Sequence, residues 1–296
     1  MKVRKEVKEI EEVNGAKEHE RNIAAFFDLD GTLLAPPSLE RRFFRMLRYR
    51  REIPTTNYFL WLMEALRLLP RGVNAILHAN KMYLQGVHIL DERGERDGGV
   101  SSWHKSGHQE EGQASAPPRR NPRLPVPAFF APAIERLVWH AKQGHEIVVV
   151  TGTLEPLAWQ VVSAMEDELA VRGITARICV CATRLEEMDG KWTGRISGEA
   201  MFGEAKARAA KWLAGEMQLD LGRCYAYGDS LHDRWWLAVV GKPAAVNPSK
   251  DLLRISQTRG WQVLHWNGKE NRSPRGRESR AQRDCPMDLV RPENAE

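Results

Sequence analysis

The sequence is poor in cysteine and lacks any apolar segment long enough to cross a membrane. Only four cysteines occur in 296 residues, and no two of them form a CxxC pair. A cysteine-based zinc site needs ligands at such spacings, so we expect buried free thiols instead. The most apolar stretch, residues 58–69, contains Glu64 and Arg67 and falls short of the roughly 20 residues that a membrane span needs.

The N-terminal residues also do not show the pattern of a signal peptide. The first 20 residues are rich in Lys and Glu rather than apolar, so we expect a soluble cytoplasmic protein with no membrane partner. The net charge is only +5 and its basic excess is local, which argues against a nucleic-acid partner. One basic group lies beyond residue 270, and the other comprises Arg41, Arg42, Arg45, Arg48, Arg50 and Arg51. This second group is either a solvated helix face or a means of attracting an anionic substrate.

Composition divides the chain into segments of different character. In residues 38–90, apolar residues recur at helical spacing between prolines, which predicts a helical insert. Residues 91–127 have too few large apolar side chains to bury a core, which predicts a flexible loop. The remaining predicted segments are a charged flexible extension (1–21), an α/β core (22–37 and 128–266) and a disordered tail (267–296).

Short apolar runs alternate with helical patterns through the core. We expect strands at residues 23–27, 147–150, 177–182, 224–227, 244–246 and 261–265. A hairpin is expected over 184–196, turning at Asp189-Gly190. Strands that alternate with helices form right-handed βαβ units. The sequence therefore predicts an α/β fold with a doubly wound, Rossmann-like parallel sheet and a helical insert after its first strand.

The polar residues that follow these strands should meet at one edge of the sheet, where ligands bind in doubly wound folds. They are Asp28 and Asp30 after the first strand, Thr151 and Gly152 after the second, Asp229 and Asp233 after the fourth, and Lys206 at the start of a helix. Clustered carboxylates suit Mg²⁺, and a carboxylate can itself attack phosphorus. A second carboxyl group can protonate the leaving alkoxide, while a lysine and a hydroxyl hold phosphoryl oxygens.

Four segments resemble the motifs of the haloacid-dehalogenase-like phosphohydrolases, in order and approximate spacing. Residues 26–34 (FFDLDGTLL) resemble the first motif, residues 148–151 (VVVT) the second, Lys206 within 202–206 the third, and residues 228–233 (GDSLHD) the fourth. The resemblance covers roughly residues 22–266. The insert lies between the first two motifs, where the phosphoserine-phosphatase-like branch, subfamily IB, carries its small helical cap. One departure is Thr151-Gly152-Thr153, where that branch often has Ser-Ala-Ser.

The resemblance implies a role for each candidate residue. Asp28 would be the nucleophile and a Mg²⁺ ligand, and Asp30 the general acid/base, with its backbone carbonyl as a second ligand. Asp229 would be the third ligand, with Asp233 supporting the metal through water or the outer shell. Phosphate would be bound by Thr151, Gly152 and Lys206. The implied reaction is Mg²⁺-dependent hydrolysis of a small phosphorylated metabolite, possible substrates including a phosphoserine-like compound, through an aspartyl-phosphate.

Other interpretations remain open at this point. The same intermediate could pass its phosphoryl group to an alcohol, as in a phosphotransferase. A non-catalytic protein could bind phospho-ligands, or nucleic acid through its arginines. Asp233 could simply stabilise a helix N-terminus, and His104 and His232 read as ordinary surface residues. The sequence leaves the oligomeric state undetermined.

Overall fold

The structure, a computed structural model, describes residues 22–89 and 125–267. The predicted N-terminal extension, most of the predicted loop and the predicted tail lie outside these residues. The described core is a six-stranded parallel sheet in the order β3-β2-β1-β6-β7-β8. Its strands are β1 (Ala24–Phe27), β2 (Glu146–Leu154), β3 (Ile178–Thr183), β6 (Tyr225–Gly228), β7 (Lys242–Val246) and β8 (Gln262–Leu264).

The central strands are buried on both faces, as their continuous apolar runs predict. Along β1, Ala24 and Phe26 pack into one hydrophobic cluster, and Ala25 and Phe27 pack into the other. This alternation follows from the two-residue period of a strand. All four side chains are fully buried, so no solvated face remains and the sheet must be covered on both sides.

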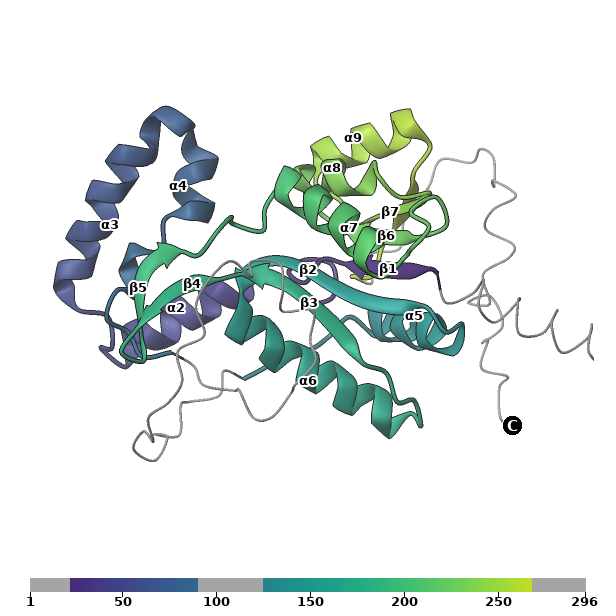
Figure 1. Ribbon diagram of the computed structural model, residues 1–296, viewed down its shortest axis with the longest axis horizontal. Helices are drawn as coiled ribbons and strands as arrows, with labels where there is room; N and C mark the ends of the chain where they lie inside the picture. Colours follow the sequence, from purple (N-terminus) through teal and green to yellow (C-terminus); the bar gives the residue numbers. More distant parts are fainter. Residues whose placement is uncertain (1–21, 90–124, 268–296) are drawn as a thin grey trace, which may run out of the picture.

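Helices cover both faces (Figure 1). The cluster on one face includes residues of α5 (Ala131–Lys142) and α6 (Glu155–Val171). The cluster on the other includes residues of α7 (Glu204–Glu216), α8 (Arg234–Leu237) and α9 (Lys250–Arg259). The sequence therefore predicted the doubly wound architecture correctly. Within the described ranges, no helix combines the length and apolar character needed to traverse a bilayer.

Residues 38–89 form the helical insert, as the apolar spacing predicts. It contains α2 (Leu39–Tyr49), α3 (Thr55–Leu68) and α4 (Val73–Ala79), with the 3₁₀ turns η1 (Leu69–Arg71) and η2 (Met82–Leu84). Ser38 starts α2, and its hydroxyl accepts a hydrogen bond from the Arg41 amide. Phe43 and Leu47 on α2 are buried in the same cluster as α5 and α6. The insert is thereby attached to the core rather than tethered beside it.

The predicted hairpin is present, and it packs against the insert. Its strands β4 (Leu185–Met188) and β5 (Lys191–Ile196) join at Asp189-Gly190, where both residues have positive φ. Trp192 lies edge-on to Phe43 of α2, with ring centroids 6.0 Å apart, and its amide donates to the carbonyl of Val87. Two segments far apart in the sequence therefore build one unit beside the sheet.

Candidate active site

Asp28 lies directly beyond β1, at the carboxyl edge of the sheet. Its amide donates to the carbonyl of Tyr227 at 2.9 Å, which continues the pairing of β1 with β6 by one residue. Its Oδ1 accepts the Leu29 amide at 2.8 Å, and only 7% of the residue is exposed. Burial is the main cause that raises the pKa of the Asp28 carboxyl to about 7, against the lowering effect of Lys206.

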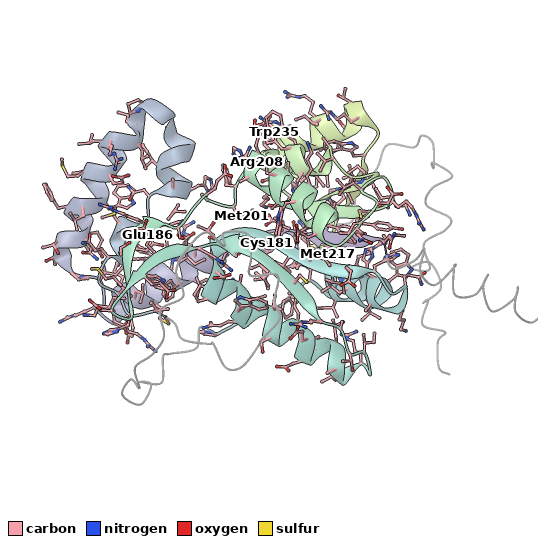
Figure 2. All side chains as sticks on the ribbon, viewed as in Figure 1. Cys181, Glu186, Met201, Arg208, Met217 and Trp235 are labelled. Carbon is pink, nitrogen blue, oxygen red and sulfur yellow. The ribbon has the colours of Figure 1, made fainter. Side chains whose placement is uncertain are left out.

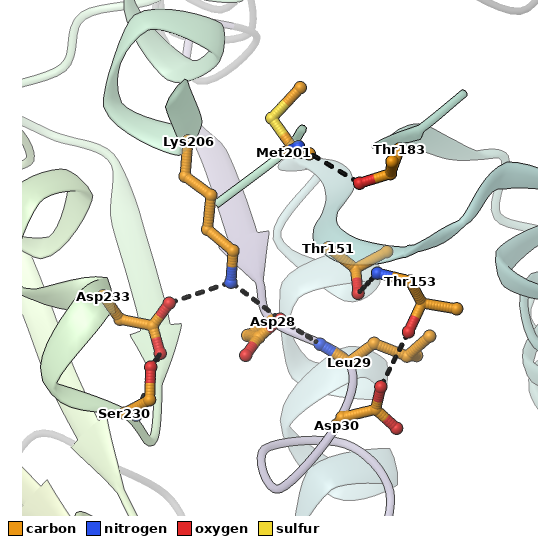
Figure 3. A network of polar contacts seen from close by, with 10 residues as sticks. All are labelled: Asp28, Leu29, Asp30, Thr151, Thr153, Thr183, Met201, Lys206, Ser230 and Asp233. Carbon is orange, nitrogen blue, oxygen red and sulfur yellow. Dashed lines mark hydrogen bonds and ion pairs between the residues drawn. The ribbon is translucent and has the colours of Figure 1, made fainter. Parts of the chain in front are cut away.

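Lys206 brings one buried positive charge to this edge from the first turn of α7 (Figure 3). Its Nζ lies 2.8 Å from Oδ1 of Asp28 and 2.8 Å from Oδ1 of Asp233. Burial alone would lower the pKa of the Lys206 ammonium, but the two carboxylates outweigh it and the pKa is raised. The lysine is thus charged and fixed between two aspartates.

Asp233 is held by the turn η3 (Leu231–Asp233) that follows β6. Its Oδ2 accepts hydrogen bonds from the amide and hydroxyl of Ser230, at 2.9 and 2.8 Å, and its Oδ1 accepts from Lys206. Burial opposes ionisation, yet Lys206 and Ser230 lower the pKa of Asp233. Gly228 makes room for this side chain, because a Cβ there would lie 2.7 Å from Cβ of Asp233. Asp233 therefore caps the start of η3 and also lies beside the other carboxylates.

Asp229 completes a group of three carboxylates. Asp28, Asp229 and Asp233 each place one oxygen within 4.8 Å of the others. Burial and the charges of its two neighbours raise the pKa of Asp229 to about 9. Gly31 lets the loop approach, since a Cβ there would lie 2.2 Å from Oδ2 of Asp229 and its φ is +87°.

This donor set fits a divalent cation. Three carboxylates face one another with Lys206 as the cation between two of them, so negative charge is left uncompensated. Burial is the main cause of the raised pKa values of Asp28 and Asp229, and the neighbouring carboxylates raise them further. Carboxylate oxygens at one spot are the ligands that Mg²⁺ prefers. The residues that the sequence brings to this edge can therefore hold the ion that was predicted.

Asp30 lies on the same loop but points to a different set of donors (Figure 3). Its Oδ2 accepts a hydrogen bond from the hydroxyl of Thr153 at 2.7 Å, and its Oδ1 accepts the Leu39 amide at 2.8 Å. Burial raises the pKa of the Asp30 carboxyl, while these two hydrogen bonds lower it. Its carboxyl group is thus anchored to β2 on one side and to the first residue of α2 on the other.

The predicted phosphate-binding residues occupy the end of β2. Thr151 is buried, and its hydroxyl oxygen accepts the Thr153 amide at 3.2 Å. Gly152 is partly exposed, and a Cβ there would lie 3.4 Å from the carbonyl oxygen of Met201. β2 continues to Leu154 rather than ending before Thr151 as predicted. Thr153 was not assigned a role from the sequence, although residues two apart on a strand point to the same side.

The insert also contributes groups near this edge that the sequence did not single out. His78 of α4 stacks on Phe202 of the core with ring centroids 3.4 Å apart, and Phe202 lies 4.2 Å from the ring of His232. Buried Lys81 is paired with Glu40, which also accepts a hydrogen bond from the hydroxyl of Tyr83 at 2.8 Å. Near the carboxyl edge of the sheet, the insert therefore contributes polar and aromatic side chains.

Comparison with known proteins places this geometry in a family. The profile of the haloacid dehalogenase-like hydrolases matches residues 25–238. A probable phosphatase of Mycobacterium tuberculosis is 34% identical over 142 residues, which cover 48% of this chain and 46% of that protein. Phosphoserine phosphatase SerB1 of the same organism is 34% identical over 124 residues, covering 42% and 37% of the two chains. The chain thus spans less than half the length of these curated relatives.

One solved structure is similar over most of both chains. It is a protein of unknown function from Bordetella pertussis Tohama I, with 27% identity and a TM-score of 0.55. The match covers 83% of this chain and 99% of the Bordetella protein. The family profile spans β1 to α8 and so includes all of the residues that converge at the carboxyl edge of the sheet. As its sequence motifs predict, this chain belongs to the haloacid dehalogenase-like hydrolase family.

Proposed function

We propose that the protein is a Mg²⁺-dependent phosphatase that hydrolyses a small phosphomonoester through a phosphorylated Asp28. The observation that carries this proposal is the contact between Asp28 and Lys206 inside a cluster of three carboxylates. A nucleophilic carboxylate, a cation for the phosphoryl oxygens and a metal-binding donor set then occupy one buried spot. The phosphatase names of two relatives support the same reaction class.

In the first half of the proposed reaction, Asp28 is the nucleophile and Asp30 is the general acid. An Asp28 oxygen attacks phosphorus, and the bond from phosphorus to the ester oxygen breaks. The Asp30 carboxyl group gives its proton to the leaving oxygen, so that an alcohol is released. Burial raises the pKa of Asp30, which supports its holding a proton when the substrate binds.

The second half reverses the role of Asp30. Its carboxylate takes a proton from water, and the resulting hydroxide attacks phosphorus of the aspartyl-phosphate. Inorganic phosphate leaves, and the Asp28 carboxylate is restored. Lys206 and the hydroxyl of Thr151, with the backbone at Gly152, hold phosphoryl oxygens through both steps.

Mg²⁺ would be held by the carboxylates of Asp28 and Asp229 and the backbone carbonyl of Asp30, with Asp233 in support, and would supply charge neutralisation for the phosphoryl group. The proposed domain organisation assigns substrate choice to the helical insert acting as a cap. Two contacts support this assignment: the amide of Leu39, in the insert, donates to Asp30, and His78 of the insert stacks on Phe202 of the core.

The test is a screen of phosphorylated metabolites, including phosphoserine, with purified protein and Mg²⁺. Release of inorganic phosphate from at least one substrate, lost on chelation, is the expected result. Phosphate release that requires an added alcohol acceptor would identify a phosphotransferase instead. Binding of phosphorylated compounds with no turnover in any condition would contradict the proposal and indicate a non-catalytic protein.

A further inference from the structure

Helix α3 of the insert presents an apolar stripe to solvent. Its residues repeat at the i, i+3, i+4, i+7 spacing of one helix side. They are Tyr58 (43% exposed), Phe59 (62%), Leu62 (50%), Met63 (50%) and Leu66 (56%). Leu69 and Val73, which follow the helix in the sequence, are also exposed, at 56% and 64%. Single exposed apolar residues are ordinary, but a contiguous stripe of this kind marks an interaction surface.

The contacts of α3 fix this stripe on the outside. Buried Asn57 donates from Nδ2 to the carbonyls of Tyr83 and Gln85, at 3.1 and 2.7 Å. Asn80 donates to the carbonyl of Trp61 at 2.8 Å. These bonds fix the helix with its inward side against η2, so it cannot rotate to bury the stripe. Figures 1 and 2 show α3 at the outer edge of the molecule, with side chains that project away from the core.

The insert that carries the stripe is strongly basic. Residues 38–89 contain nine Lys and Arg residues and three acidic residues, a formal net charge of +6 in a chain whose total is +5. Four of the arginines are exposed and have no carboxylate partner among the described residues: Arg41, Arg45, Arg48 and Arg51. Because Arg51 is four residues before the start of α3, it lies at most about 14 Å from that helix terminus.

These charges favour one of the possible binding partners of the apolar stripe. A second copy of the chain would bring an equally basic insert against the first, and like charges oppose that contact. A bilayer with anionic headgroups complements both features, because such a surface takes up apolar side chains at its boundary and attracts nearby arginines. We propose that α3 lies in the interface of a membrane that contains anionic lipids. This differs from the sequence-based expectation of no membrane partner, which depended on the lack of a membrane span, because a 14-residue helix on the membrane surface does not need one.

Vesicle binding by the full chain tests the apolar part of this proposal. The protein is sedimented at low salt with vesicles of phosphatidylcholine alone or of phosphatidylcholine mixed with phosphatidylglycerol. We expect binding to the mixed vesicles. The variant Phe59→Ser/Leu62→Ser/Leu66→Ser should lose at least about tenfold in affinity. The control is Val171→Ser, at an 86% exposed site at the end of α6, which should bind like wild type.

The basic part is tested by Arg45→Gln/Arg48→Gln/Arg51→Gln. At about fivefold per charge, this variant should lose affinity on the order of a hundredfold. The matched control removes three exposed positive charges from α7 and α9: Lys211→Gln/Lys250→Gln/Arg254→Gln. Circular dichroism establishes that each variant is folded. The control should retain most of the binding, since its charges lie outside the insert.

Three results would overturn the proposal. The first is an absence of binding to mixed vesicles by the wild-type chain. The second is equal binding by wild type and both triple variants of the insert, which would assign the lipid contact to another surface. The third is a dimer in solution that the apolar triple variant dissociates, with no vesicle binding, which would assign the face to a second copy. None of these outcomes bears on catalysis, because the stripe contains no residue of the active site.

Discussion

Nζ of Lys206 lies 2.8 Å from Oδ1 of Asp28, and both side chains are buried at the carboxyl edge of the sheet. The same nitrogen is 2.8 Å from Oδ1 of Asp233. One ammonium group therefore joins the end of β1 to the turn after β6, while a third carboxylate, Asp229, stays close by. The stability of this region and its proposed chemistry depend on the same few charges.

Replacing Lys206 by methionine should lower both the stability of the protein and its phosphatase activity. The change leaves Asp28 and Asp233 buried without their cation, and breaking a buried pair in this way costs about 3–5 kcal/mol. Losing a group that stabilises phosphoryl oxygens should lower kcat by about 10²–10³. Urea denaturation and phosphate-release kinetics measure the two effects. Lys211→Met is the control, because Lys211 is an exposed lysine of the same helix; equal stability of the two variants would refute the structural part.

Asp30→Asn should separate catalysis from stability. An asparagine can accept from the Leu39 amide and donate to the Thr153 hydroxyl, so both anchors are kept. It cannot exchange a proton with the leaving oxygen or with water. We expect kcat to fall by about 10²–10⁴, with a much smaller change in the free energy of unfolding because both hydrogen bonds are kept. A variant with wild-type kcat would remove Asp30 from the proposed mechanism.

Thr153 is predicted to act through Asp30 rather than on the substrate. Its hydroxyl lowers the pKa of the Asp30 carboxyl, so Thr153→Val should raise that pKa. The acid then loses its proton at a higher pH. The basic limb of the profile of kcat/KM against pH should therefore shift to higher pH. Thr153→Ser keeps the hydroxyl and should restore the wild-type profile. If Thr153→Val loses activity without any shift of the profile, its role is only structural.

The carboxylate cluster predicts how Mg²⁺ and pH act on stability. In the folded protein the pKa values of Asp28 and Asp229 are about 7 and about 9, mainly through burial, against 3.8 for a free side chain. The folded chain thus holds protons that the unfolded chain releases. This stabilising contribution is complete below pH 4 and is lost as the pH rises through 7 and 9.

Metal-free protein should therefore become less stable between pH 7 and pH 9, by up to about 1.4 kcal/mol per pH unit for each proton held. Mg²⁺ bound at the proposed site would take the place of these protons, so the stabilisation that it adds should grow over the same range. Thermal denaturation in EDTA and in Mg²⁺ measures both trends. Asp229→Asn should reduce the pH dependence of both quantities. A metal-free wild-type protein whose Tm rises from pH 7 to 9 would contradict this prediction.

Much of this arrangement could be predicted from the sequence because it depends on local patterns. Apolar runs such as residues 23–27 identify strands that are buried on both sides, and parallel strands place their following residues at a common edge. The approach of Asp28 and Asp229, which follow neighbouring strands β1 and β6, is what that rule predicts. Gly31, with a positive φ and no room for a Cβ beside Asp229, is the backbone feature that makes the approach possible.

The rest depends on contacts that no local pattern encodes. The hairpin was predicted, but its packing of Trp192 against Phe43 joins segments about 150 residues apart. The pair of Lys81 with Glu40 likewise forms across the insert. The apolar spacing of α3 predicts a helix face, but it does not show whether the fold covers that face. The hydrogen bonds of Asn57 and Asn80 determine which side of α3 remains exposed.

The most direct test of the central claim is the fate of the phosphoryl group at Asp28. Wild-type protein is mixed with para-nitrophenyl phosphate and Mg²⁺, quenched in acid and digested. Mass spectrometry should find the phosphoryl group on the peptide that contains Asp28, and Asp28→Asn should show neither this adduct nor Mg²⁺-dependent release of nitrophenol. Hydrolysis by Asp28→Asn at the wild-type rate, or an adduct at another residue, would contradict the account.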